Sequence, residues 1–113
     1  MSLKLYSPEE LSKQTSGSQD FMKKLAELFV NALEKDLEIL TNHADNKDYA
    51  AIKASLHKMK SGLVILGSKK LHNQCKEIEI LAAEEQLLSI ELMPELLSNF
   101  RKLSNELKVD FNL

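Results

Sequence analysis

Apolar residues recur at steps of three and four along most of the chain. The pattern runs from about Ser18 to about Asn42, from about Lys47 to Leu66, from about Ser68 to Glu84, and from about Ile90 or Pro94 to Val109. This spacing keeps apolar side chains on one face of an α-helix. Alternating apolar and polar residues, which indicate strands, are nearly absent. The pattern therefore predicts four long amphipathic helices.

Each predicted helix has a stripe of residues expected to be buried. In the first long helix the stripe consists of Phe21, Leu25, Leu28, Phe29, Ala32, Leu37 and Leu40. The second consists of Tyr49, Ile52, Leu56, Met59, Leu63 and Leu66. The third consists of Leu71, Cys75, Ile78 and Leu81 or Ala82, and the last of Leu96, Leu97, Phe100, Leu103 and Leu107.

The polar segments between the stripes indicate where helices begin and end. Ser7 followed by Pro8 predicts a short N-terminal helix at about 7–15, since proline is favoured at the first helical position. Gly67 is a typical residue for ending a helix in the left-handed conformation. Short turns favour antiparallel neighbours. We expect an all-α fold, an antiparallel up-down-up-down four-helix bundle at about 18–109, within a single domain spanning 1–113.

Composition narrows the class of protein without changing this fold. A chain of 113 residues with 43% hydrophobic and 28% charged residues suits one globular domain. Fifteen basic and 17 acidic residues are interspersed along it, so general affinity for nucleic acid or an anionic membrane is not expected. With a single cysteine, no signal-peptide pattern and no apolar run long enough for a membrane span, we expect a cytoplasmic monomer without direct membrane contact.

His57 is the main candidate for chemistry. At ~100° per residue it lies roughly 130° from the centre of the buried stripe of its helix, so it should face solvent. Lys53 and Lys60 lie on the adjoining turns and can reach the imidazole. An ordinary surface histidine is the alternative, but flanking lysines would suit a side chain that carries an anion. A phosphoryl group would bring about −1.5 to −2 charge.

The residues that follow His57 are unusual for a helix. Ser61 lies one turn further along the same face, and Gly62 costs about 0.5–1 kcal/mol relative to alanine. The glycine either gives a partner access to the imidazole or allows close helix packing. Val64 and Ile65 lie off the buried stripe, so either another helix covers them or they form an exposed apolar patch suited to a protein partner.

At these residues the sequence resembles the histidine-containing phosphotransfer (HPt) domain. The family pattern has an exposed histidine, then a hydrophobic residue, lysine and glycine, and a Leu-Gly pair about ten positions later. The corresponding residues here are His57, Met59, Lys60, Leu66 and Gly67. The resemblance extends over roughly 20–107. One departure is Ser61, which stands where the family usually has glycine.

The resemblance implies a phosphorelay function. Such domains accept a phosphoryl group from a receiver-domain aspartate and pass it to another, without binding ATP and without kinase activity. By this resemblance His57 is the phosphorylated catalytic residue. Residues next to the phosphate would be Lys53, Lys60, Ser61 and Gly62, and partner-docking residues would be Lys58, Val64, Ile65 and Gly67.

The partners implied are response-regulator receiver domains and a hybrid sensor histidine kinase. Mg²⁺ belongs to the receiver, so no cofactor and no metal is expected on this chain. Asn31 and Glu79 should lie level with His57, but the group that orients the second ring nitrogen is left open.

Two other readings of the sequence remain. A metal-binding bundle could use His43, His57, His72 and Cys75, although Cys75 falls on a buried stripe. A non-catalytic interaction module, including a degenerate HPt-like adaptor, could dock partners through the same apolar surface.

Overall fold

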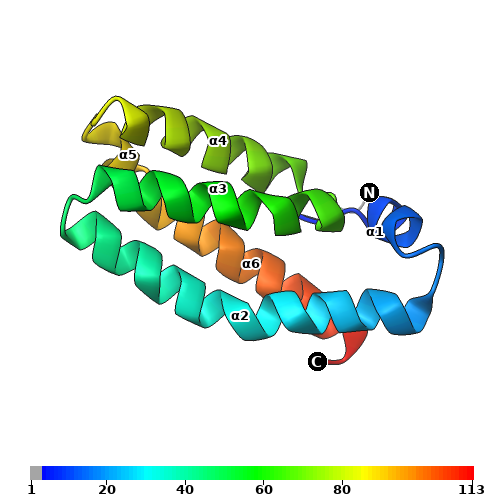
Figure 1. Ribbon diagram of the computed structural model, residues 1–113. Helices are drawn as coiled ribbons and strands as arrows, with labels where there is room; N and C mark the ends of the chain where they lie inside the picture. Colours follow the sequence, from blue (N-terminus) through cyan, green and yellow to red (C-terminus); the bar gives the residue numbers. More distant parts are fainter. Residues whose placement is uncertain (1–3) are drawn as a thin grey trace.

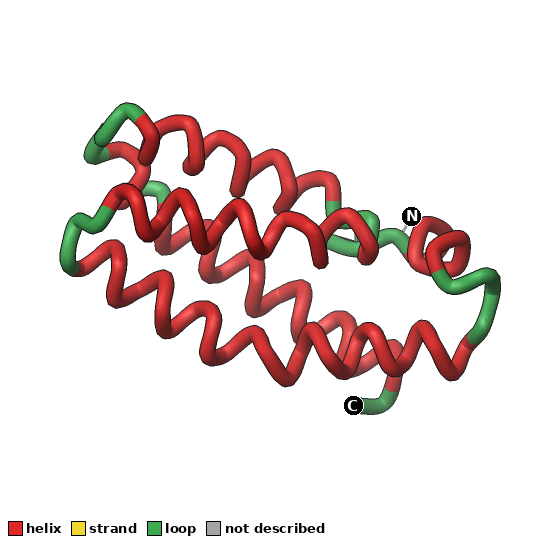
Figure 2. Tube along the Cα trace, viewed as in Figure 1, coloured by secondary structure: helices red, strands yellow, loops and turns green. Residues whose placement is uncertain are grey.

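The computed structural model describes residues 4–113, so the first three residues of the predicted domain lie outside it. Within the described residues the chain is helical, with short connections and no strand (Figure 2). The helices are α1 (Pro8–Gln14), α2 (Gln19–Asp45), α3 (Tyr49–Leu66), α4 (Lys69–Ala83), α5 (Leu88–Glu91) and α6 (Met93–Phe111).

Four of these helices form an elongated antiparallel bundle (Figure 1). Helix α3 packs between α2 and α4, and α6 packs against both α2 and α4 on the other side. Helix α1 closes one end of the bundle against α2 and α3. The described residues measure 42 × 24 × 21 Å. The prediction of an all-α up-down-up-down bundle with an extra N-terminal helix is therefore confirmed.

Local sequence accounts for most helix ends. The hydroxyl oxygens of Ser7 and Ser18 accept from backbone N–H groups in the first turns of α1 and α2, and the Asp48 carboxylate does so for α3. The predicted ends were wrong at two places. Helix α2 continues to Asp45 instead of ending at Asn42, and the last segment divides into α5 and α6 at Leu92.

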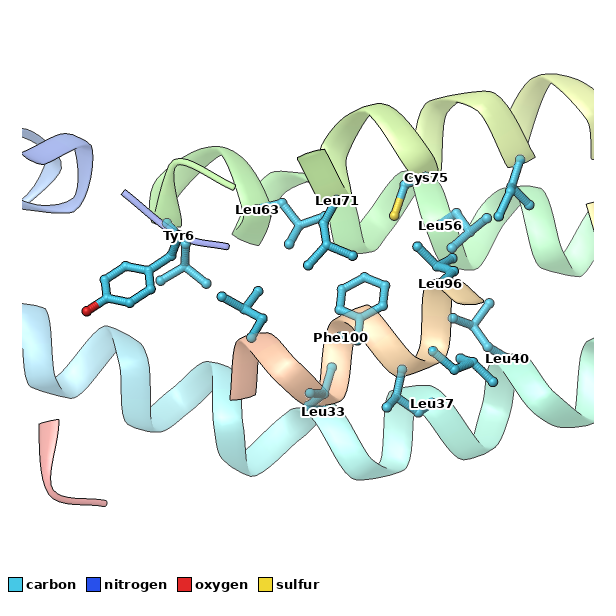
Figure 3. Packing of buried hydrophobic residues seen from close by; sticks show 14 of the residues in the cluster. Tyr6, Leu33, Leu37, Leu40, Leu56, Leu63, Leu71, Cys75, Leu96 and Phe100 are labelled. Carbon is cyan, nitrogen blue, oxygen red and sulfur yellow. The ribbon is translucent and has the colours of Figure 1, made fainter. Parts of the chain in front are cut away.

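The core lies along the bundle axis, with Phe100 of α6 near its middle (Figure 3). Leucines of the other long helices surround it, namely Leu33, Leu37, Leu40, Leu56, Leu63 and Leu71. Close packing of this kind supplies most of the stability of an amphipathic helix.

The predicted stripe of α2 was wrong at three positions. Phe21 and Leu28 are 48% and 58% exposed, and Ala32 is also exposed. The buried residues are instead Met22, Ala26, Leu33, Leu37, Leu40 and Ala44. A helix this rich in apolar residues carries two neighbouring apolar stripes, and periodicity does not say which one faces the axis. Of the residues wrongly predicted to be buried, Leu28 contributes to an apolar surface on α2 next to α3.

The segment before α1 is hydrogen-bonded to the C-terminal part of α6 and to the end of α3. Tyr6 Oη donates to Asp110 Oδ2 at 2.5 Å, and Leu5 N donates to Glu106 Oε1 at 2.7 Å. Hydrogen bonds from Lys4 and Tyr6 hold the pKa of the Asp110 carboxyl below its usual range. At the other end of this segment Ser7 N donates to Leu66 O at 2.9 Å, which satisfies a carbonyl in the last turn of α3.

Gly67 joins α3 to α4 where only glycine fits well. Its φ is +66°, in the left-handed region, and a Cβ there would lie 2.8 Å from Ser7 Cβ and 2.7 Å from Glu10 Cβ. Both the backbone conformation and the close approach of α1 therefore exclude a side chain.

Replacing Gly67 with alanine should lower the free energy of unfolding by about 1–3 kcal/mol, because the change adds backbone strain and a steric clash. Urea denaturation followed by circular dichroism would measure this. The matched control is Gly62→Ala, whose Cβ would meet Phe29 at an ordinary 3.7 Å. The control should be neutral or stabilising by up to about 1 kcal/mol. Equal losses in the two variants would contradict this account of Gly67.

Candidate functional site

His57 lies in the middle of α3 and points away from the core. Leu56 and Leu63 on the same helix are fully buried, which fixes the rotation of α3 about its axis. The His57 side chain is 79% exposed. Helical periodicity had placed this histidine on the solvent side, and the structure places it there.

Helix α4 brings a buried carboxylate to this histidine. Glu79 Oε1 lies 3.3 Å from His57 Nδ1, and Glu79 Oε2 lies 2.5 Å from Lys60 Nζ. The Glu79 side chain is only 9% exposed, and that of Lys60 is 19% exposed. A buried charge is costly unless it is paired, so the carboxylate requires these two partners. Glu79 of α4 therefore contacts two residues of α3, His57 and Lys60.

The contact with Glu79 influences which ring nitrogen of His57 carries the hydrogen. An ionised carboxylate cannot donate a hydrogen bond, so this contact favours the form of His57 with the hydrogen on Nδ1. In neutral imidazole the other nitrogen then has the free lone pair. In that form Nε2 of His57 carries the lone pair, on a side chain open to solvent.

Sequence reasoning placed Glu79 level with His57 but gave it no role. A signal was present, because Glu79 is a charged residue beside Ile78 and Ala82 on the buried stripe of α4. A carboxylate in such a place needs a partner from another helix. Asn31, the other residue expected at this level, is exposed.

The other predicted site residues lie around His57 in different settings. Lys53, Lys58 and Ser61 are exposed on α3. The Ser61 hydroxyl donates to Lys58 O at 3.0 Å, in the same helix. Gly62 faces the Phe29 ring of α2, where a Cβ would make an ordinary contact, so close packing does not require glycine.

A shallow groove opens between α2 and α3 beside this face. It has a volume of about 230 Å³ and is lined by Leu25, Leu28, Phe29, Gly62, Ile65 and Leu66. Val64 and Ile65 are 53% and 37% exposed, so they are open to solvent. Gly67, also predicted as a docking residue, lies under Ser7 and Glu10 of α1.

The residues proposed for a metal site do not come together. Among residues 4–113, no three His, Cys, Asp or Glu side chains gather as a metal site requires. Cys75 is fully buried, and burial raises the pKa of its thiol to about 12, which keeps it neutral in the core. In the same described part of the chain, no helix is both long and apolar enough to cross a membrane.

Comparisons with known proteins indicate the family of this chain. The Hpt domain family model matches residues 24–108. The phosphorelay intermediate protein YPD1 of Candida albicans is 29% identical over 70 residues, which are 62% of this chain and 38% of that protein. The matched region thus spans well under half the length of this curated relative.

A solved structure is similar over nearly the whole chain. Histidine-containing phosphotransfer protein B from Pseudomonas aeruginosa PAO1 superposes with a TM-score of 0.77 at 22% identity. The match covers 98% of this chain and 94% of that one. At this level of identity the likeness concerns the fold.

The contact with Glu79 predicts the tautomer of neutral His57. In ¹⁵N-labelled protein, NMR should show the hydrogen on Nδ1 of His57, and Glu79→Ala should remove this preference because the acceptor is lost. His72, about two turns away from Glu79 along α4, is the internal reference and should not change. An Nε2–H tautomer of His57 in the unaltered protein would contradict the assignment.

Proposed function

This chain belongs to the Hpt domain family, and we propose that it is a phosphorelay intermediate of two-component signalling. His57 accepts a phosphoryl group from the aspartate of a receiver domain and passes it to another receiver aspartate. The observation that carries the proposal is the exposed imidazole whose Nδ1 lies 3.3 Å from Glu79 Oε1, so that Nε2 is free to attack.

The chemistry requires little beyond this nucleophile. The Nε2 lone pair attacks phosphorus while the bond from phosphorus to the aspartate oxygen breaks, and the aspartate leaves as a carboxylate. Lys60 and Lys53 offset the charge of the phosphoryl group. Ser61 is a small residue one turn along the helix from the imidazole, which keeps the approach open. The domain has no kinase activity of its own, and the receiver supplies Mg²⁺.

The groove between α2 and α3 is the proposed docking surface. Its exposed apolar side chains, Leu28 and Ile65, lie on the two helices that flank it, and Val64 and Lys58 extend the surface along α3. Apolar area next to charged groups is typical of protein interfaces. Receiver domains, and a hybrid sensor histidine kinase that carries one, are the proposed partners. We leave Gly67 out, because α1 packs against it.

A non-catalytic adaptor is the second candidate function. The exposed apolar groove would serve such a module equally well. Docking alone, however, gives no reason for a buried carboxylate that binds both an exposed histidine and a lysine. The relay accounts for both features.

Phosphotransfer to His57 is the direct test. The protein is incubated with receiver domains phosphorylated by a small-molecule phosphodonor, and we expect acid-labile, base-stable label on the chain. His57→Gln should abolish the label, because amide nitrogen is not a nucleophile. The matched control is His43→Gln, a histidine in the last turn of α2, which should label normally. Absence of label on the unaltered protein with several receivers would refute the relay and favour the adaptor.

A charge placed in the groove should slow transfer by weakening docking. For Ile65→Lys we expect the transfer rate at low receiver concentration to fall about tenfold or more, with recovery at saturating receiver. Val109→Lys is the control, because Val109 is more exposed, at 76%, and lies on α6 beside Lys102. Equal effects of the two substitutions would show that the groove is not the docking surface.

A further inference from the structure

A second set of exposed apolar side chains lies where α4 turns into α5. Ile80, in the last turn of α4, is 51% exposed, and Leu87 and Leu88 after it are 49% and 45% exposed. We call these three residues the α4–α5 patch. It lies at the end of the bundle where α5 joins α4 to α6, whereas the groove opens beside the last turns of α3 (Figure 1). Exposed apolar area of this kind marks a site of interaction.

The charged residues of this segment have a single sign. Between residues 77 and 100 each of them is a glutamate, although the whole chain has 15 basic and 17 acidic residues. All but Glu79 are exposed. These exposed glutamates, which we call the acidic rim, are Glu77, Glu84, Glu85, Glu91 and Glu95. The rim gives this side of the bundle a negative potential.

The acidic rim lies on one side of Ile80. Glu77 and Glu84, three residues before Ile80 and four after it, share its face of α4. Glu77 also lines a cavity together with residues of α6, so this side of α4 faces α6. Along α4, Lys76 is three residues before Glu79, and it therefore lies on the side towards α3. The acidic surface thus extends from Ile80 towards α5 and α6.

A small cavity between α4 and α6 lies within this acidic surface. Its volume is about 50 Å³, and its lining residues are Gln74, Glu77, Ile78, Leu92, Glu95 and Leu96. Ile78 and Leu96 are buried, while Glu77 and Glu95 are exposed. A lysine or arginine side chain suits such a cavity, since its alkyl stem can lie on apolar atoms while its cationic end pairs with a carboxylate.

We propose that the α4–α5 patch and the acidic rim form a docking surface for a basic segment of a partner protein, in which lysine or arginine is interleaved with apolar residues. The apolar side chains of this segment cover Ile80, Leu87 and Leu88, and its cations pair with the glutamates. The inference goes beyond the proposed relay and does not depend on it, because neither His57 nor the groove between α2 and α3 takes part.

The charge of the surface selects among possible occupants. A nucleic acid or an anionic membrane would bring its phosphates against carboxylates, and like charges repel. A second copy that docked through the same patch would bring two acidic rims together. Within residues 4–113 no three His, Cys, Asp or Glu side chains gather as a metal site requires, so the glutamates are not a metal centre. A basic segment with apolar residues satisfies both the apolar area and the charge.

Charge and apolar contact contribute differently to an interface of this kind. Charges at a rim mainly steer the partner and make association depend on salt. Buried apolar anchors mainly slow dissociation. The proposal therefore predicts that substitutions in the acidic rim change the association rate, and that substitutions in the α4–α5 patch change the dissociation rate.

Binding of a synthetic peptide tests the proposal. The probe is a lysine–leucine peptide whose leucines recur at steps of three and four. In a titration of the ¹⁵N-labelled chain, NMR should show shifts at Ile80, Leu88 and Glu91, and added salt should weaken the binding. The same peptide with glutamate in place of every lysine should not bind. Absence of binding by the lysine–leucine peptide would overturn the proposal, as would shifts centred on Leu28 and Ile65 of the groove.

Reversing two charges of the acidic rim should slow association. For Glu84→Lys combined with Glu91→Lys we expect the association rate of the peptide, measured by surface plasmon resonance, to fall about tenfold or more. Glu34→Lys combined with Glu38→Lys is the matched control, because it makes the same change in net charge at two exposed glutamates of α2. Equal losses in the two variants would show that only net charge matters and would overturn the proposal.

Truncating the α4–α5 patch should speed dissociation. For Ile80→Ser we expect the dissociation rate to rise about threefold or more, while Val109→Ser, at an exposed apolar residue of α6, should leave it unchanged. Sedimentation of the unaltered chain distinguishes the remaining occupant, since a dimer that Ile80→Ser abolishes would overturn the proposal in favour of a second copy. A chain that takes no phosphoryl label but binds the peptide in this way refutes only the relay.

Discussion

The interaction on which the site depends is the packing of α4 against α3, because it buries Glu79 beside His57 and Lys60. The carboxylate can be accommodated at 9% exposure only with both partners in place. The two helices are thereby held in one register at the level of the histidine. A shift of one turn along α4 would move Glu79 about 5.4 Å away and leave a buried charge unpaired. The same pairing that orients the imidazole thus also discriminates against wrong packings of the bundle.

One face of helix α3 packs into the core, and another face carries the candidate site. Leu56 and Leu63 are fully buried, while His57, between them in sequence, is 79% exposed. The C-terminal end of this helix is held by Gly67 in the left-handed conformation and by the hydrogen bond from Ser7 to Leu66. A helix anchored in this way presents the proposed nucleophile on a rigid element, which suits transfer to a partner that must approach within bonding distance.

The proposed docking groove arises from the way in which α2 packs. Helix α2 turns Met22, Ala26 and Leu33 to the axis, and this leaves Leu28 uncovered next to Ile65 of α3. The apolar surface therefore borders α3, the helix that carries His57. A receiver seated on the groove would bring its aspartate towards His57. Chemistry and recognition then use adjacent parts of a single surface.

The sequence alone determined the helical fold, the exposure of His57 and the lysines around it, because period and residue type are local properties. It also determined the ends at Ser7, Ser18 and Gly67, where the side chain or its absence acts on its own backbone. Tertiary structure decided which apolar stripe of α2 is buried, where α5 and α6 divide, and which group binds Nδ1. Each of these features depends on which helices pack together and on how each helix is rotated about its own axis. Glu79 shows the difference, since its position on a buried stripe was visible in the sequence and its two partners were not.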